Sequence, residues 1–191
     1  MRRILRNRLA LSTVVTTLII LVVSVLLAGV VTYFAINVTS TRVQEESVHI
    51  TKHHVWHNGS SRALAALMII NTGGRDVVID KLSVRGQTCD WNSSSSEKFV
   101  TYCRTADTVS DDLPYVDEFN RTEDTEVTID TKTYNFSVAT DDLILRSGYT
   151  MLIYIINPDS ISINDIGLTV SIEIFTAQAM YYREANVQAV N

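Results

Sequence analysis

The pattern of hydrophobic residues changes near residue 47 of this chain. From Leu9 to Ile36 the sequence carries no charge and consists mostly of Val, Leu, Ile and Ala. Such a stretch is long enough to cross a bilayer, since about 20 residues span the hydrocarbon core. As a helix it would measure about 42 Å, at ~1.5 Å per residue. Beyond Ser47 the apolar residues fall into short runs between polar segments, which is typical of strands.

These short runs predict their strands in different ways. Two apolar runs flank the sequence NTGGRD, where Gly73 and Gly74 would supply the positive φ of a tight hairpin turn. The run TMLIYII ends at Asn157-Pro158, because proline cannot continue a ladder. The stretch GLTVSIEIFTAQ alternates with period two, which predicts one buried face. We expect a first strand in VHITKHHVWH and a final strand in AMYYREANVQAV.

Six or more short strands with polar turns predict an all-β, immunoglobulin-like sandwich. The apolar runs around Ile69 and Ile153 are nearly continuous, so we expect central strands that are covered on both faces. The expected organisation is a basic tip at 1–8, a helix and stalk at 9–47, and a β-sandwich at 48–191. The β-sandwich includes an acidic loop at 87–136.

Charge predicts the orientation of the apolar segment. Four of the 16 basic residues precede it: Arg2, Arg3, Arg6 and Arg8. The positive-inside rule then places the N-terminus in the cytoplasm and everything after about Val38 outside. The chain holds 21 acidic residues and a net charge of −5, so the exterior part is strongly acidic. An acidic exterior argues against nucleic acid as a partner.

Candidate glycosylation sites lie in the expected exterior part. Five Asn-x-Ser/Thr sequons occur, at Asn37, Asn58, Asn92, Asn120 and Asn135. We expect glycans on Asn58, Asn92, Asn120 and Asn135, whereas Asn37 is too close to the bilayer. The alternative is a chance accumulation of sequons in a chain rich in Ser and Thr.

Two cysteines, Cys89 and Cys103, lie close together in the sequence. In an oxidising compartment we expect a disulfide between them, worth about 3 kcal/mol for a loop of this size. Two free thiols are the alternative.

The clustered carboxylates of the acidic loop could hold Ca²⁺, which takes six to eight oxygen ligands. Their spacing matches no calcium-binding loop, so we expect a solvated excursion between strands. His49, His53 and His57 recur every four residues. On one face of a strand successive members would lie about 13 Å apart, too far to share one metal. We find no catalytic motif, and therefore expect neither an enzyme nor a cofactor.

The segment LALSTVVTTLIILVVSVLLAGVVTYFAINVTSTRV, from Leu9 to Val43, resembles the N-terminal segment of archaeal type IV pilins and archaellin-like proteins. In that family a prepilin peptidase cuts after a Gly or Ala that follows a short basic leader. The matching residues are Arg8 in the leader, Ala10 before the cut and Leu11 as the new N-terminus. Leu9 stands where the family usually has a charged residue.

The resemblance implies a filament subunit. A long N-terminal helix would carry a β-sandwich head that is often glycosylated, and turns like INTGG recur in such heads. After processing, helices 11–36 of many copies would bundle in the core of an extracellular filament or adhesive appendage. The other hypothesis is a permanent membrane anchor carrying an extracellular module that binds a protein, a glycan or an envelope layer. A cleaved signal peptide is disfavoured, because its apolar core would be only ~7–15 residues long.

Overall fold

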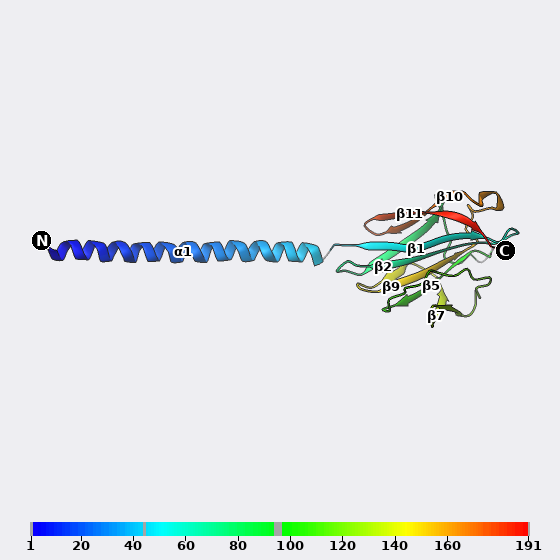
Figure 1. Cartoon of the computed structure of the whole chain (residues 1–191), viewed down its shortest axis with the longest axis horizontal. Coiled ribbons are helices and arrows are strands. Elements are labelled where there is room, and N and C mark those ends of the chain that lie inside the picture. Colours follow the sequence, from blue (N-terminus) through cyan, green and yellow to red (C-terminus); the bar gives the residue numbers. More distant parts are fainter. Residues whose placement is uncertain (1, 44, 94–96, 191) are drawn as a thin grey trace. The chain divides into compact units, whose positions relative to one another are not determined.

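The computed structural model describes residues 2–43, 45–93 and 97–190. They form two units, Met1–Gln44 and Glu45–Asn191. The first is one long apolar helix, α1 (Arg2–Val43), and the second is a mostly β domain (Figure 1). We expected the β domain to begin at residue 48. It begins slightly earlier, because the carbonyl of Ser47 accepts hydrogen bonds from the backbone N–H groups of Thr72 and Gly73, at 2.9 and 3.1 Å.

The predicted strands at 48–57, 150–156 and 169–176 and the final strand are all present in the β domain. The alternating strand buries Val170, Ile172 and Ile174 as expected, since period-two alternation puts these side chains on one face. Leu168, which we expected on the same face, precedes β10 and is 49% exposed. The domain comprises β1 (Val48–His57), β2 (Ala63–Asn71), β3 (Val77–Val84), β4 (Gln87–Thr88), β5 (Phe99–Thr105), β6 (Thr125–Ile129), β7 (Lys132–Val138), β8 (Leu143–Leu145), β9 (Thr150–Ile156), the short 3₁₀ helix η1 (Ile163–Asp165), β10 (Thr169–Thr176) and β11 (Met180–Ala189).

The strands form two groups that meet at one joint. Sheet A consists of β1, β2, β9, β5, β7 and β6 in that order, all antiparallel neighbours. Sheet B consists of β11, β10 and β3, with β4 and β8 both pairing with β3. The joint is a parallel pairing of Val55–His57 in β1 with Val187–Ala189 in β11.

The predicted hairpin across NTGGRD is wrong. Strand β2 lies between β1 and β9, and β3 belongs to sheet B, so this turn carries the chain from one sheet to the other. Neither Gly73 nor Gly74 is among the described glycines with positive φ. Gly73 is needed for close packing instead, because a Cβ there would lie 2.7 Å from both the Glu45 carbonyl oxygen and the Ser47 nitrogen. The sequence pattern showed two strands and a turn, but it carried no information about which strands pair.

Two hydrophobic clusters cover the two faces of sheet A. The first lies between the sheets, where Leu67 and Ile153 of sheet A meet Leu82 and Ile172 of sheet B. The second lies on the opposite face, around Tyr154. Every residue of β9 is buried, and so is nearly all of β2. The prediction of central strands covered on both faces is therefore confirmed.

The outer cover of the second cluster comes from the hairpin β6–β7 and from the acidic segment 106–124, which we call the acidic lid. We expected a solvated loop across 87–136, and that is wrong for much of this stretch, because it contains β5, β6 and β7 as well as the acidic lid. For the lid itself the expectation is only half right. The carboxylates of the lid are exposed, but Val109, Leu113 and Phe119 are buried, at 8, 2 and 8% exposure. The Phe119 ring centroid lies 4.9 Å from that of Tyr154. Isolated apolar residues among acids gave no periodic signal, so the sequence did not reveal this packing.

Candidate functional site

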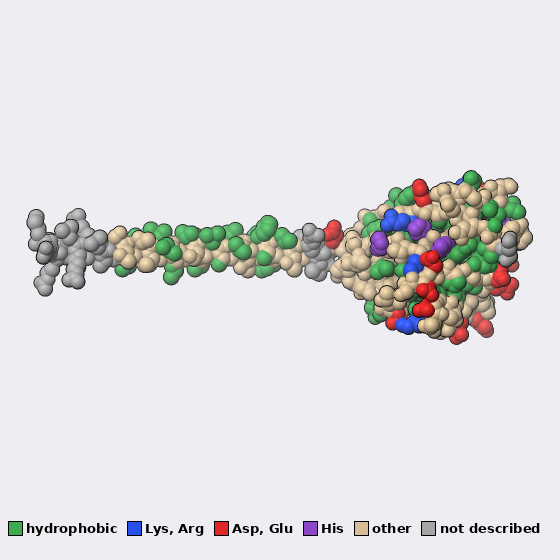
Figure 2. Space-filling model, viewed as in Figure 1, with side chains coloured by type: hydrophobic (Ala, Val, Ile, Leu, Met, Phe, Trp, Pro, Cys, Tyr) green, Lys and Arg blue, Asp and Glu red, His purple; other side chains and the backbone are tan. Residues whose placement is uncertain are grey.

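The uncharged part of α1 is the largest exposed apolar surface among the described residues. From Ser12 to Ser40 the helix is long and apolar enough to cross a membrane, and none of this stretch is buried within the chain. Leu26, Val30 and Phe34 are each more than 60% exposed, as the hydrophobic atoms along the helix in Figure 2 illustrate. Soluble proteins rarely leave a continuous apolar surface of this size uncovered. An N-terminal helix with such a surface fits a membrane anchor or a signal sequence.

The hydroxyl groups of α1 fit an apolar environment. Ser24 Oγ donates to the Ile20 carbonyl at 2.7 Å, and Thr32 Oγ1 donates to the Ala28 carbonyl at 2.8 Å. Thr16 Oγ1 makes the same kind of bond, at 2.9 Å. Where water is absent, each polar group needs such an internal partner. These side chains therefore add little polarity to the helix surface.

The predicted processing residues, Ala10 and Leu11, lie inside α1. Their side chains are outside the described residues, so the structure gives the backbone conformation of this junction and nothing of its contacts.

The sequons in the β domain lie on its lid side. Asn120 belongs to the acidic lid, and Asn135 lies on β7. Asn92 accepts a 2.8 Å hydrogen bond from Nε of Arg121, a lid residue, and Asn58 shares a pocket with Asp117 of the lid. Asn92, Asn120 and Asn135 are exposed, and Asn58 is half-buried. No sequon asparagine lies on a described strand of sheet B.

The predicted disulfide between Cys89 and Cys103 is not formed, and both residues are free thiols. Cys89 packs against the first hydrophobic cluster, whereas Cys103 packs against the second. Sheet A thus separates the two sulfur atoms, which closeness in sequence did not indicate. Burial raises the pKa of Cys89 to about 12 and also raises the pKa of Cys103. Neither cysteine has the low pKa of a reactive thiol.

A bulge in β1 separates the histidines that were expected to share a face. The register shifts between Thr51 and His54, and Lys52 adopts a positive φ of 49°. As a result His49, which pairs with Ile70, lies on the side of the second cluster. His57 shares a face with Val55, on the side of the first cluster. A bulge of this kind cannot be predicted from alternation alone.

The β1 bulge also anchors the acidic lid. Lys52 Nζ donates to the carbonyls of Val109 and Asp111, at 2.8 and 2.5 Å. The imidazole of His54 lies 3.4 Å from the Asp112 carboxylate and stacks on Trp56. No group of three or more His, Cys, Asp or Glu side chains suited to a metal ion occurs among the described residues.

A polar pocket of about 470 Å³ lies where the β1–β2 turn, the end of β9 and the acidic lid meet. The Asn157 amide nitrogen donates to the Glu97 carbonyl at 3.1 Å, and Arg62 donates to the Asp117 carbonyl. Such a pocket offers hydrogen-bond donors and acceptors to a polar ligand. Sequence reasoning missed it because its lining comes from separate segments. The lining residues are Asn58, Ser61, Arg62, Glu97, Asp117, Glu118 and Asn157.

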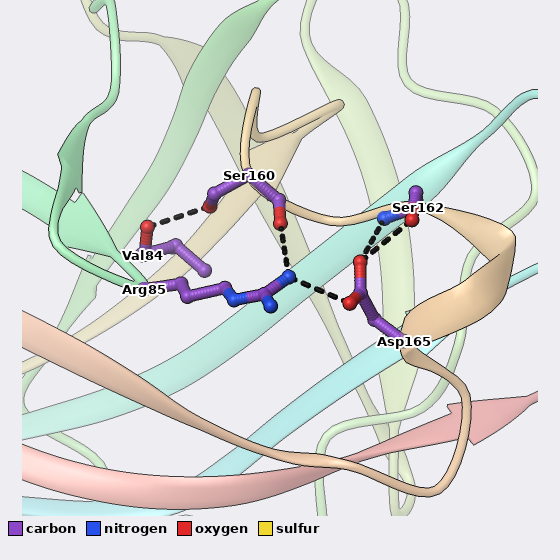
Figure 3. Close-up of polar contacts among 5 residues, drawn as sticks. All are labelled: Val84, Arg85, Ser160, Ser162 and Asp165. Atoms are coloured by element: carbon purple, nitrogen blue, oxygen red, sulfur yellow. Dashed lines mark hydrogen bonds and ion pairs between the residues drawn. The ribbon is translucent and has the colours of Figure 1, made fainter.

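An ion pair between the buried Asp165 and the exposed Arg85 fixes the loop between β9 and β10 (Figure 3). Asp165 is 6% exposed, and its carboxylate accepts hydrogen bonds from Ser162 N and Oγ at 2.8 and 2.7 Å. Its other oxygen lies 2.6 Å from Arg85 Nη1, which also donates to the Ser160 carbonyl at 3.1 Å. The bonds from Ser162, with a contribution from Arg85, lower the pKa of Asp165. Because the Asp165 carboxylate is fully partnered by Ser162 and by Arg85, which follows β3, we assign this network a structural role.

Comparisons with known proteins identify no family for this chain. No family model matches it, and no curated protein matches it. Among solved structures, a copper-bound PCuAC domain from PmoF2 aligns at 10% sequence identity, covering 77% of this chain and 100% of that chain. The TM-score of 0.32 is too low for the likeness to support any conclusion about fold or function.

Proposed function

We propose that this chain is a type IV pilin-like surface protein, a subunit of an extracellular filament or adhesive appendage. The observation that carries the proposal is the division of the chain into a helix with a long uncharged stretch, none of it buried within the chain, and a separately packed β domain. The sequence around Ala10 adds the resemblance to archaeal pilins. In the filament, sister helices would replace lipid as the cover of the apolar surface, through residues 11–36.

The β domain fits the role of a solvent-facing head. Its two antiparallel sheets pack about one core, which supports classifying it as immunoglobulin-like. Its lid side carries the exposed sequon asparagines Asn92, Asn120 and Asn135 and the acidic carboxylates. Glycans and negative charge suit an extracellular surface rather than a packed interior.

The polar pocket favours a second candidate function. In this alternative the helix stays in the membrane, and the β domain binds a polar ligand such as a glycan, an envelope component or a protein loop. The pocket has convergent backbone and side-chain polar groups from Asn157, Glu97 and Arg62.

The mature N-terminus separates the two candidates. Mass spectrometry of the protein from its native cells should find Leu11 as the first residue if it is a processed subunit. Ala10→Val should block the cut, and Ala28→Val, a matched change within the helix, should leave it unaffected. Leu9→Lys, which restores the charge usual at this place, should increase the processed fraction. An intact Met1 in the membrane fraction, with no filaments in sheared surface material, would refute the filament proposal.

A further inference from the structure

A small groove lies where the end of β5 meets the turn between β8 and β9. It has a volume of about 200 Å³ and is lined by Arg104, Arg146 and Tyr149, and we call it the arginine groove. Arg104 belongs to β5 of sheet A, whereas Arg146 directly follows β8 of sheet B. The two sheets therefore contribute one guanidinium group each. The arginine groove shares no lining residue with the polar pocket.

The side chain of Arg104 is held in place by two contacts. Its Cζ atom lies 5.4 Å from the centre of the Tyr102 ring, over which the guanidinium stacks. Its Nη1 donates to the Ile144 carbonyl of β8 at 3.4 Å. Stacking on an aromatic ring orients a guanidinium without using its N–H groups. Most of the five N–H donors of this arginine therefore remain available to a ligand.

Neither arginine of the groove has an acidic partner. Among the described residues, no carboxylate oxygen lies within 4.0 Å of a side-chain nitrogen of Arg104 or Arg146. Asp76 accepts a 2.9 Å hydrogen bond from Ser147 N, and Asp107 pairs with Lys132 at 3.0 Å. The acids that flank the groove in sequence or in strand register are Asp76, Asp107, Asp141 and Asp142. The last two precede β8, whereas Arg146 follows it. The positive charge of the groove is thus not neutralised by direct contact with these acids.

Two guanidinium groups and a phenol favour a phosphate group over a carboxylate. A carboxylate has two oxygens, and a single arginine can bind both of them. A phosphate monoester has three terminal oxygens and a charge of about −1.5 to −2 at pH 7, which two arginines match. Tyr149 is 37% exposed, and its hydroxyl forms no hydrogen bond within the described part of the chain. It can donate to the third oxygen.

The arginine groove lies at the end of the β domain from which the chain leads back to α1. Asn71 N donates to the Tyr149 carbonyl at 3.1 Å, and the next residue, Thr72, donates its N–H to the Ser47 carbonyl at 2.9 Å. Ser47 directly precedes β1, and α1 ends at Val43. Where a membrane holds α1, lipid headgroups are therefore one source of phosphate for this end of the domain. A soluble phosphorylated molecule is the other.

We infer that the arginine groove is a binding site for a phosphate monoester group, with Arg104 and Arg146 as its charged donors and Tyr149 as a neutral donor. The inference goes beyond the proposed function, because it applies to a filament subunit and to a permanently anchored module alike.

The test is an NMR titration of the full chain in micelles of a nonionic detergent that contains no phosphate. Glycerol 3-phosphate should shift the backbone amide signals of residues 146–149 in a saturable way. Arg104→Gln and Arg146→Gln should each weaken this binding about tenfold or more, because each removes charge-assisted hydrogen bonds. Arg104→Lys keeps the charge but not the planar fork, so it should weaken binding less than Arg104→Gln does.

The control for charge is Lys81→Gln, which removes an exposed positive charge on β3, outside the groove. It should leave the binding of glycerol 3-phosphate unchanged. Thermal unfolding of each variant shows whether the fold is intact, and we expect the Tm of all these variants to be close to that of the wild type, since the exchanged side chains are exposed.

A comparison of ligands identifies the anion and its source. Acetate should bind about tenfold or more weakly than glycerol 3-phosphate, since it leaves one arginine without a partner. Lysophosphatidic acid presents the same phosphate group from within the micelle. Tighter binding of lysophosphatidic acid than of glycerol 3-phosphate would assign the site to a lipid headgroup, and equal or weaker binding would assign it to a soluble phosphate compound.

Three results would overturn the inference. They are no saturable shift with either phosphate ligand, binding that Arg104→Gln and Arg146→Gln leave as strong as in the wild type, and acetate binding as tight as that of glycerol 3-phosphate. The last result would point to a carboxylate on a partner protein instead. Each of these measurements is independent of a cut after Ala10, so the failure of this inference and the failure of the filament proposal can be told apart.

Discussion

The side chain of Asn71 should be one of the largest polar contributors to the stability of the β domain. It is fully buried at the end of β2. Its Nδ2 donates to the carbonyls of Arg75 and Leu145 at 2.8 and 3.1 Å, and its Oδ1 accepts from Gly73 N at 3.0 Å. These bonds hold together the turn between the sheets and the end of β8.

Asn71→Ala removes all three bonds and takes the amide donor away from the buried Leu145 carbonyl, whereas Gly73 N keeps its bond to the Ser47 carbonyl. At about 1 kcal/mol for each of three bonds, we expect a loss of about 3 kcal/mol in the free energy of unfolding. For a domain of this size that corresponds to a fall in Tm of about 6–12 °C. Asn71→Asp keeps the shape but points a carboxylate at two carbonyl oxygens, so it should destabilise at least as much at neutral pH.

The assay is thermal unfolding of the full chain in detergent, followed by tryptophan fluorescence. Both tryptophans, Trp56 and Trp91, belong to the β domain, so the signal does not depend on α1. Asn186→Ala is the matched control, since this asparagine is exposed on β11 and its side chain accepts a 2.7 Å hydrogen bond from Thr169. The control should shift Tm by less than about 2 °C. A shift below about 3 °C for Asn71→Ala, or a stable Asn71→Asp, would refute the reasoning.

Three other predictions follow from the same structure. Because the pKa of Asp165 is lowered in the folded state, its carboxylate stabilises the fold above its ordinary pKa of 3.8, and this contribution is lost as the pH falls through the folded pKa. Urea unfolding should therefore show Asp165→Asn clearly less stable than wild type at pH 7, with a smaller difference at pH 3. Equal differences at both pH values would contradict this. The pKa of Cys89 is raised to about 12 in the folded chain. In a Cys103→Ser background at pH 8, the folded chain should therefore react with iodoacetamide about a hundredfold or more slowly than the chain unfolded in urea. Comparable rates would show that the fold does not protect the thiol. Phe119→Ala should lower the free energy of unfolding by about 3 kcal/mol and expose the acidic lid to limited proteolysis within 106–124. Glu118→Ala, at an exposed neighbour, should do neither. A lid that stays resistant in Phe119→Ala would mean that Lys52 and His54 suffice to hold it.

The strands were predictable because they carry strong local signals. The uninterrupted runs of β2 and β9 required burial on both faces, and the alternation of β10 required burial on one. Pairing was not predictable, since buried runs on both sides of NTGGRD fit a hairpin and a crossing between sheets equally well. The decisive group is the Asn71 amide, whose bond to the Leu145 carbonyl depends on a segment 74 residues away in the sequence.

The candidate site shows the same division. The apolar surface of α1 was evident from composition, because a charge-free stretch made mostly of Val, Leu, Ile and Ala has too few polar residues to form a polar face. The polar pocket and the arginine groove were not evident, since each gathers residues from separate strands and turns. The predicted disulfide of Cys103 and the predicted common face of His49 and His57 were wrong for a related reason. Successive residues of a strand point to opposite faces of the sheet, so one extra residue exchanges the faces of all the residues that follow it. The β1 bulge has this effect on the histidines.

The position of β1 has a mechanical consequence. The chain passes from α1 through Glu45–Ser47 directly into β1, which pairs with β2 antiparallel from Val48↔Asn71 to His57↔Ala63. A tensile load between the helix and the polar pocket acts along β1, while the ladder hydrogen bonds lie perpendicular to the strand. The bonds are then sheared together rather than opened one after another. A domain entered in this way should resist extension along β1 more strongly than one whose terminal strand is opened from its end.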